Sequence, residues 1–254
     1  MDLYLTGKRA LISGSSSGLG AECARRLAQE GCKVVVHGRD RDRAEQTAED
    51  IRKAGGEAAV TTGDLEKDED ANKVCEDALA AFGGIDILVN NAGLLIRADN
   101  PDWTTVPTSD WLRSFNINVV AAVRLAQKLV PGMIERGWGR VIGINTECAM
   151  QTFEHQSAYV SGKRGMDGVL RVLAREVGRH QVTVNQVAPG WMVSDKFRAA
   201  GTERQPDYER EVPMRRRGYD QDVANAVAFL ASDLAAFITG VYLPVCGGNV
   251  MPAI

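Results

Sequence analysis

Short apolar, β-branched runs alternate with longer amphipathic segments through most of the chain. This alternation is typical of repeated strand–helix units around a parallel sheet. No internal repeat, low-complexity tract or linker divides the sequence, so we expect residues 1–254 to form a single domain. Seven strands with helices between them predict a three-layer, doubly wound α/β fold. The strand candidates are Ala10–Ser13, Lys33–Val36, Ala58–Thr61, Ile85–Val89, Val141–Ile144, Val182–Val187 and Val241–Val245.

The charge balance excludes some classes of partner. A formal net charge of -3 argues against nucleic acid or an anionic membrane as the main partner. The N-terminus lacks the basic start and apolar block of a signal peptide, and no apolar run approaches the ~20 residues that span a bilayer. We therefore expect a cytoplasmic protein. The 3 histidines show no metal-ligand spacing, so no metal site is predicted, and the 5 cysteines are scattered, which suits reduced core thiols.

A glycine-rich turn follows the first strand. Gly14, Gly18 and Gly20 have the spacing Gly-x-x-x-Gly-x-Gly, and a helical pattern begins at Ala21. Glycines at such a turn let the backbone approach a pyrophosphate, whose charge is stabilised by the free N–H groups at the helix start. Any tight turn between a strand and a helix can use glycine, but this position favours dinucleotide binding.

Tyr159 and Lys163 lie four residues apart, so on a helix their side chains share one face. A free phenol has a pKa of about 10, and half ionisation at neutral pH needs a shift of roughly three units, or about 4 kcal/mol. A nearby ammonium in a water-poor cleft favours the phenolate. The pair therefore predicts a tyrosine that transfers protons to or from a substrate oxygen. The alternative is a surface tyrosine over a lysine stem.

These motifs occur together with Asn90-Asn91-Ala92-Gly93 after the fourth strand and Pro189-Gly190 after the sixth. In this order the sequence resembles the short-chain dehydrogenase/reductase family, in its type of about 250 residues, from Gly7 to Gly248. The resemblance implies a Rossmann-like fold and a nicotinamide cofactor. It also implies that the cofactor contacts Gly14, Ser15, Ser17, Gly18, Leu19, Gly20, Asp64, Leu65, Asn91, Ala92, Gly93, Tyr159, Lys163, Pro189, Gly190, Met192 and Ser194.

Two of these positions leave alternatives open. Asp64 resembles the residue that holds the adenine, but it is equally suited to cap a helix starting at Glu66. Gly93 would lie against the cofactor, or it is simply a turn glycine with positive φ.

The end of the second strand bears on the choice of cofactor. Gly38 occupies the place where NAD-using relatives put aspartate, and Arg39 matches the arginine of NADP-using ones. A guanidinium gives a 2′-phosphate a charge-assisted contact. We therefore predict NADP(H), with NAD(H) as the alternative if Asp40 binds the ribose instead.

The resemblance also assigns catalytic roles. Tyr159 is the proton donor, Lys163 binds the nicotinamide ribose and lowers the pKa of the tyrosine, and Asn118 supports a proton relay. Thr146 stands where the family carries serine; its hydroxyl still donates a hydrogen bond to a substrate oxygen, while its methyl narrows the pocket. This departure leaves a non-catalytic dinucleotide-binding regulator as a rival hypothesis. Enoyl reductases of related fold are less similar, because they place more residues between tyrosine and lysine.

The substrate is expected to lie among mostly apolar side chains, and Arg97 is a candidate ligand for a substrate carboxylate. The loop Leu94–Pro107 is expected to wall the substrate mouth, and Lys196–Arg217 reads as a mobile lid. Arg215–Arg217 within that lid are expected to be a solvated or inter-subunit charge run. The predicted substrate contacts are Thr146, Glu147, Tyr159 and Trp191, with Leu94, Leu95, Met150, Phe153, His155, Met192 and Phe197 as further pocket candidates.

A helix is expected from Thr108 to about Arg136, with N-cap candidates at residues 108–110. Its apolar positions exceed one sheet-covering face, and the pattern after Lys163, including Met166 and Leu170, is expected to complete a second interface helix. A homotetramer or homodimer is therefore predicted. Altogether the sequence predicts an NADPH-dependent carbonyl reductase acting on a small ketone or secondary alcohol, or else an NAD-dependent alcohol dehydrogenase of the same family.

Overall fold

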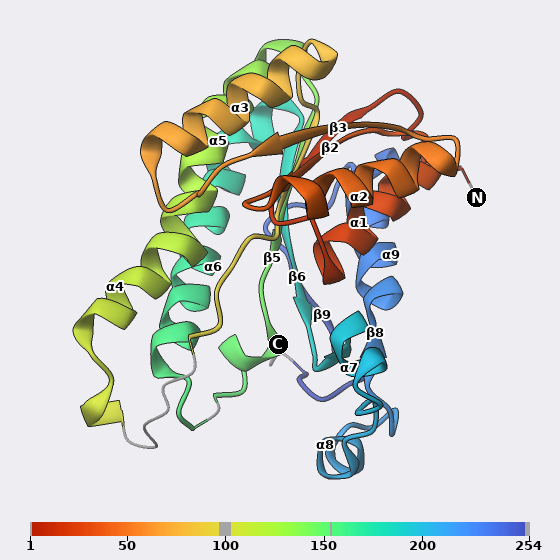
Figure 1. Cartoon of the computed structure of the whole chain (residues 1–254). Helices are drawn as coiled ribbons and strands as arrows, with labels where there is room; N and C mark the ends of the chain where they lie inside the picture. Colours follow the sequence, from red (N-terminus) through yellow and green to blue (C-terminus); the bar gives the residue numbers. More distant parts are fainter. Residues whose placement is uncertain (1, 97–102, 153, 252–254) are drawn as a thin grey trace.

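A computed structural model describes residues 2–96, 103–152 and 154–251. Its centre is a seven-stranded sheet in the order β3-β2-β1-β4-β5-β6-β9, and every neighbouring pair is parallel. The predicted three-layer, doubly wound fold is therefore confirmed (Figure 1). The strands are β1 (Arg9–Ile12), β2 (Lys33–Gly38), β3 (Glu57–Thr62), β4 (Ile87–Asn90), β5 (Gly139–Ile144), β6 (Val182–Pro189) and β9 (Tyr242–Val245).

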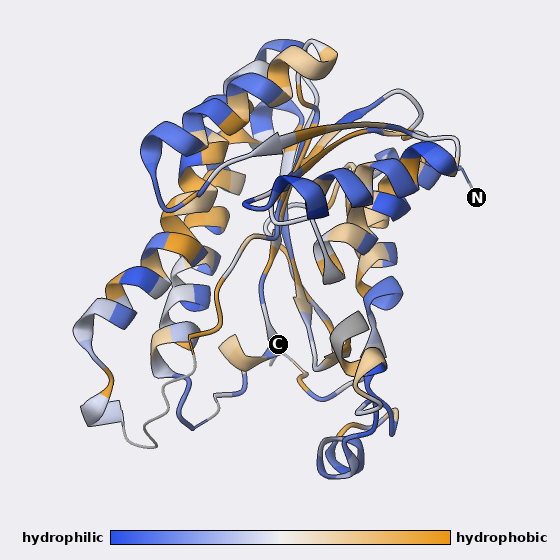
Figure 2. Ribbon diagram, viewed as in Figure 1, coloured by the Kyte–Doolittle hydropathy of each residue, from blue (hydrophilic) through white to orange (hydrophobic). Residues whose placement is uncertain are grey.

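Helices cover both faces of this sheet (Figure 1). One face packs against α1 (Gly18–Gln29), α2 (Arg41–Lys53) and α9 (Asp220–Ala231). The other face packs against α3 (Asp68–Phe82), α5 (Ala121–Arg136) and α6 (Ser157–Val177). Figure 2 shows hydrophobic residues concentrated on the strands and on α5, whereas α2 is mostly hydrophilic. Each face thus buries its own apolar core.

The chain order reverses at the centre of the sheet. β1 pairs with β2 on one side and with β4 on the other, so the chain runs outward from β1 to β3 and then crosses back to start the other half of the sheet at β4. Ligands of such folds bind outside the carboxyl ends of the strands at this switch point. The glycine turn after β1 and the segment after β4 meet there, which fixes where a site is built.

The remaining elements lie outside the main sheet. A two-stranded sheet pairs β7 (Met192–Val193) with β8 (Gly218–Tyr219), and neither strand is among those that the sequence predicts. The other elements are α4 (Thr108–Phe115), α7 (Asp195–Ala199), α8 (Pro206–Glu211) and the short turns η1 (Trp103–Thr105), η3 (Glu147–Ala149), η4 (Gly178–His180) and η5 (Asp233–Ala235).

The predicted helix from Thr108 to Arg136 is present but not uniform. The π-helical segment η2 (Asn116–Val120) separates α4 from α5, and Pro107, not residues 108–110, occupies the N-cap position. By length and composition alone Thr108–Arg136 qualifies as a membrane span, contrary to our reading of the apolar runs. In the structure its residues Leu125, Leu129 and Met133 lie in the core beneath the sheet.

The observed start of one strand differs from the predicted start, because a polar residue there bonds to another segment. β4 was predicted over Ile85–Val89 but begins at Ile87, because Asp86 pairs with Arg9 at 2.6 Å in the preceding turn. On α6, Met166 and Leu170 are buried in the core, so these two do not belong to an interface as expected.

Candidate active site

The glycine turn forms a tight cradle at the start of α1. The helix begins at Gly18, three residues earlier than predicted, and Ser17 at the N-cap makes no side-chain cap bond. Gly14 has φ 65°. A Cβ on Gly20 would lie 2.3 Å from the Gly14 carbonyl oxygen and 2.4 Å from Asn91 Nδ2, so only glycine fits. The first-turn N–H groups of α1 are thus left for an anion.

His37 braces this cradle from β2. Its Nδ1 accepts from Gly14 N at 3.0 Å, and its Nε2 lies 3.1 Å from Gly63 O. Because a backbone N–H only donates, Nδ1 is the acceptor and Nε2–H the donor. Burial lowers the pKa of the ring, which is therefore neutral. No local pattern predicts this role of His37, since it depends on bonds from β2 to the turns after β1 and β3.

Ser15 also braces the turn and does not face the cleft, contrary to its predicted role. Its side chain is fully buried, donates to Ile12 O at 2.7 Å and accepts from His37 N at 3.0 Å. Its backbone N–H donates to His37 O at 2.7 Å. Both donors of Ser15 are therefore used within the protein.

A cavity of about 350 Å³ opens beside the cradle. Ser16 closes over Gly38, where a Cβ would lie 2.7 Å from the Ser16 Cβ and Oγ. The exposed Arg39 and Arg43 border the same space, and Asp40 does too, although its carboxylate caps α2 by accepting from Arg43 N at 3.1 Å. The lining comprises Gly14, Ser16, Ser17, His37, Gly38, Arg39, Asp40, Arg43, Gly63, Asp64, Leu65, Glu66, Asn91, Ala92, Gly93, Leu94 and Ile117.

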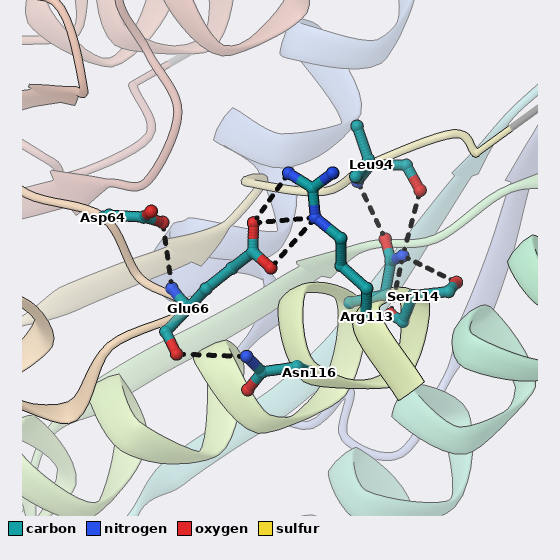
Figure 3. A network of polar contacts seen from close by, with 7 residues as sticks. Asp64, Glu66, Leu94, Arg113, Ser114 and Asn116 are labelled. Carbon is teal, nitrogen blue, oxygen red and sulfur yellow. Dashed lines mark hydrogen bonds and ion pairs between the residues drawn. The ribbon is translucent and has the colours of Figure 1, made fainter. Parts of the chain in front are cut away.

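The segment after β3, which lines the cavity, is held in place by side chains from α4 and η2 (Figure 3). Arg113 donates to both carboxylate oxygens of Glu66 at 3.1 to 3.3 Å, and Asn116 donates to Glu66 O at 3.0 Å. Asp64 accepts from Glu66 N at 3.1 Å, but α3 begins only at Asp68, so Asp64 stabilises a turn and does not cap that helix. Its carboxylate remains on the cavity wall.

The segment after β4 lies against the cradle and the catalytic candidates. Asn91 Nδ2 donates to the carbonyls of Ser13 and Gly14 at 2.9 Å, so this side chain ties β4 to the glycine turn. A Cβ on Gly93 would lie 2.8 Å from Asn118 Oδ1 and 3.2 Å from Lys163 Nζ. Gly93 does not adopt positive φ. Close approach, and not turn geometry, therefore requires this glycine.

Asn118 holds Leu94 in place from the π-helical segment. Its side chain, 1% exposed, donates to Leu94 O at 3.1 Å and accepts from Leu94 N at 3.3 Å. It also donates to Ser114 O at 3.0 Å (Figure 3 shows Leu94 and Ser114). π-Bulges in helices occur frequently at functional sites. The extra residue turns this amide toward the loop that follows β4.

Tyr159 and Thr146 meet at the end of β5. Thr146 Oγ1 accepts from Cys148 N at 3.2 Å. Burial, with Cys148 nearby, raises the pKa of Tyr159 to about 12, although the neighbouring Thr146 hydroxyl lowers it. The phenol is therefore protonated at neutral pH, which reverses the predicted direction of its pKa shift.

Lys163 lies one helical turn further along α6, as the spacing predicted. Its Nζ is 5.9 Å from the Tyr159 ring centroid and donates to Ile144 O at 2.7 Å. Burial lowers the pKa of the ammonium to about 8. Because the ammonium binds a carbonyl and is itself desolvated, it does not outweigh the effect of burial on the phenol.

The residues that follow β6 lie on the other side of the site from the glycine turn. Gly190 N donates to Val245 O at 3.0 Å, and Trp191 N donates to the Tyr208 hydroxyl at 2.9 Å. Arg217, expected to belong to a solvated or inter-subunit charge run, is 2% exposed: its guanidinium donates to the carbonyls of Trp191, Met192, Thr202 and Glu203. Ser194 accepts through its carbonyl at the start of α7.

Comparison with known proteins places this geometry in a family. The sequence profile described as "Enoyl-(Acyl carrier protein) reductase" matches residues 14–249. The 3-oxoacyl-[acyl-carrier-protein] reductase FabG of Staphylococcus epidermidis is 34% identical over 96% of this chain and 99% of its own length. The 7alpha-hydroxysteroid dehydrogenase of Escherichia coli is 32% identical over 98% of this chain and 96% of its own length.

The chain belongs to the short-chain dehydrogenase/reductase family.

Solved structures agree with this assignment. A 7 alpha-hydroxysteroid dehydrogenase complexed with NADH and 7-oxo glycochenodeoxycholic acid superposes with a TM-score of 0.88 at 31% identity, over 99% of this chain and 97% of that chain. A candidate gluconate dehydrogenase from Agrobacterium tumefaciens gives a TM-score of 0.90 at 27% identity, over 99% of this chain and all of that chain. This short-chain dehydrogenase/reductase is therefore an oxidoreductase that acts on a small molecule carrying an alcohol or carbonyl group.

The residues present fit a nicotinamide dinucleotide. The cradle at Gly20, which a Cβ would fill, and the uncapped start of α1 suit a pyrophosphate, and the adjoining cavity extends to Asp64 on one side and Gly93 on the other. Arg97 and Phe153, named as substrate candidates, lie outside the described residues. Among residues 2–96, 103–152 and 154–251, no three His, Cys, Asp or Glu side chains are placed to hold a metal ion.

Proposed function

We propose that this short-chain dehydrogenase/reductase is an NADP(H)-dependent carbonyl reductase that interconverts a ketone and a secondary alcohol. The observation that carries the proposal is the Tyr159 phenol beside Thr146 and one helical turn from Lys163, whose Nζ would lie 3.2 Å from a Cβ on the cavity-lining Gly93. A protonated phenol there is a proton donor, and the neighbouring Thr146 hydroxyl marks where a substrate oxygen sits.

The proposed mechanism assigns the proton steps to these residues. When bound, the reduced nicotinamide supplies a hydride to the carbonyl carbon. Tyr159 donates its phenolic proton to the carbonyl oxygen. Thr146 Oγ1 already accepts from Cys148 N, so its own proton is directed to the same oxygen and stabilises the developing charge. Lys163 and Asn118 lie beside Gly93, and Asn118 fixes the position of Leu94 by hydrogen bonding to its backbone.

The preference for NADP(H) is supported by charge and space at the end of β2. Arg39 and Arg43 border the cavity where an adenosine 2′-phosphate would lie, and two guanidiniums match a dianion. An aspartate at Gly38 would displace Ser16. Asp40, the alternative ribose ligand, is partly engaged in capping α2. Arg43 joins Arg39 at the cavity only through the fold, which brings the start of α2 to the same border.

Substrate and assembly follow as further parts of the proposal. Relatives named as acyl-carrier-protein and steroid enzymes favour a partly hydrophobic ketone as substrate. An apolar groove between α5 and α6 and exposed side chains such as Val172 support a homotetramer or homodimer, which light scattering tests. We also propose that residues 1–254 act as one domain in the cytoplasm and that segment 196–217 is the lid.

A spectrophotometric screen tests the proposed function. The enzyme is incubated with cyclic and linear ketones, a 3-oxoacyl thioester and an enoyl thioester, each with NADPH and NADH in parallel. We expect cofactor oxidation with ketones, faster with NADPH. Turnover of the enoyl thioester alone would replace the carbonyl reaction, and tight NADPH binding without turnover would support a non-catalytic regulator. Faster turnover with NADH would point to an NAD-dependent dehydrogenase, the reading that the NADH complex of the hydroxysteroid dehydrogenase favours.

A further inference from the structure

Glu147 is a buried carboxylate beside the candidate catalytic residues. It directly follows Thr146, is 3% exposed, and its pKa is raised by burial. Its hydrogen-bond donors are neutral: the Tyr208 hydroxyl at 3.0 Å from Oε1 and Asn249 Nδ2 at 3.0 Å from Oε2. Burying a carboxylate without a paired cation is costly. Glu147 was predicted to contact substrate, but its carboxylate points at these two protein groups.

Tyr208 extends this contact to the wall after β6. It comes from α8, is 8% exposed, and its hydroxyl accepts from Trp191 N at 2.9 Å while donating to Glu147. A Cβ on Gly190 would lie 2.6 Å from that hydroxyl and 3.0 Å from Glu147 Oε2. The tyrosine ring also packs edge-on against Trp191, with centroids 5.6 Å apart. Glycine at position 190 is thus needed for all three segments to meet.

Arg217 holds the lid segment in a different way. It donates to the carbonyl of Trp191, which precedes the segment, and to that of Glu203 within it, and its guanidinium lies 4.9 Å from the Trp191 ring centroid and 4.3 Å from that of Phe197. These contacts tie the segment to the turn that precedes it. The bonds of Glu147, in contrast, join that segment to the catalytic strand end.

We propose that Glu147 is a positioning residue: together with Tyr208 and Asn249 it forms a latch that docks α8 and the Gly190–Trp191 turn against the segment carrying Thr146. The kinetic consequence rests on the proposed function, because it assumes that substrate lies between Trp191 and Tyr159. The latch itself does not depend on that assumption.

Release of the latch changes substrate binding more than chemistry. Thr146 has bonds of its own: its N–H donates to Asn145 Oδ1 at 2.9 Å, and its carbonyl accepts from the Tyr242 hydroxyl at 2.5 Å. These bonds persist when α8 detaches. The Gly190–Trp191 turn keeps its bonds to Val245 and Arg217 but loses its contact with α8. Trp191 is then positioned less firmly, so KM rises while kcat changes little.

The decisive variants are Glu147→Met, which keeps the length of the side chain without acceptors, and Tyr208→Phe. We expect each to speed hydrogen–deuterium exchange in residues 206–211 and to raise KM about tenfold, as expected for one lost hydrogen bond to a charged group, with kcat within about threefold. The double variant resembles either single variant, because both break one contact. Glu147→Gln should behave like the wild type. Its amide oxygen still accepts from the Tyr208 hydroxyl, and if the Asn249 amide rotates, the Asn249 oxygen accepts from the new amide nitrogen.

Glu211→Gln is the matched control, because it changes an exposed carboxylate on the same helix. Circular dichroism confirms that each variant is folded. Unchanged exchange in residues 206–211 for both Glu147→Met and Tyr208→Phe would overturn the latch, as would multiplicative effects in the double variant. Exchange is measured without substrate, so the latch is tested even if no carbonyl compound is turned over.

Discussion

The two sides of the site are held together by different kinds of bonds. The dinucleotide side, from the glycine turn to Asn91, is held by backbone groups, by amide and hydroxyl side chains, by the neutral His37 and, at its surface, by the Arg113–Glu66 ion pair. The substrate side, from Trp191 to Arg217, depends on two buried charged side chains, Glu147 and Arg217, that bond to distant segments.

This difference indicates which side of the site is rigid and which side is more easily loosened by substitution. Backbone bonds within a sheet edge are set by the fold itself and survive most substitutions nearby. Buried charges with few partners are costly, and removing either partner loosens a whole segment. The dinucleotide side should therefore tolerate changes on the substrate side, and the following experiments separate the two.

The largest effect is expected at Tyr159, where the two sides meet. Tyr159→Phe removes the proton donor, so kcat should fall about 10²- to 10⁴-fold. The dissociation constant for NADPH should change by less than about tenfold, because at most one neutral hydrogen bond is lost. Steady-state kinetics and a fluorescence titration measure the two quantities. Tyr4→Phe, at an exposed site, is the control, and a large loss of NADPH affinity would mean that the two sides are not independent.

Thr146 tests the substrate side alone. Thr146→Ala removes a donor to the substrate oxygen and should lower kcat about 10²- to 10³-fold. Thr146→Ser keeps the hydroxyl and should stay within about tenfold of the wild type, with KM values for bulky ketones altered because the methyl is gone. Kinetics on a series of ketones of increasing size measure this. Equal activity of the alanine and serine variants would refute the role of the hydroxyl.

Arg39 tests the dinucleotide side alone. Arg39→Ala should weaken NADPH binding about 10- to 100-fold and leave NADH binding unchanged, because one charge-assisted contact to the 2′-phosphate is lost. Titrations with 2′,5′-ADP and 5′-AMP measure the effect without turnover. Arg41→Ala is the matched control, since Arg41 is exposed on α2 but does not border the cavity. Equal weakening toward both nucleotides would contradict phosphate recognition.

The smallest effect concerns the pH dependence of stability at His37. Burial lowers the pKa of the folded histidine below the unfolded value of about 6.5. Its contribution to stability is therefore present above pH 6.5 and is lost as the pH falls through the folded pKa. Protonation breaks the bond from Gly14, worth about 1 kcal/mol, or roughly 2–4 °C in Tm. Melting curves of His37→Asn and the control His180→Asn between pH 5 and 8 should show a flatter profile only for the former.

Much of the fold and part of the site were readable from local patterns. Apolar periodicity predicted seven parallel strands because each buried strand carries its own run of β-branched residues. The spacing of Tyr159 and Lys163 predicted one helical face, and α6 confirms it. The strands β7 and β8 were missed, since strands of two residues are too short to carry periodicity.

The sequence-based predictions of side-chain roles were wrong where a polar residue bonds to a partner far along the chain. Ser15 and Glu147 were assigned to ligands by their position next to a motif, yet their side chains bind His37 and Tyr208. Arg217 looked like part of a solvated charge run but is enclosed by four carbonyls and two rings. The pKa of Tyr159 was predicted in the wrong direction, because spacing does not report where the Lys163 ammonium donates.

The sequence by itself determined the sheet, the glycine cradle and the family, because these depend on residues that are neighbours in the chain or repeat at fixed intervals. Only the tertiary structure decided which hydroxyls and carboxylates remain available in the cleft. The physical reason is that burial and hydrogen bonding are set by contacts between segments up to 102 residues apart, such as Glu147 and Asn249, and no local pattern encodes them.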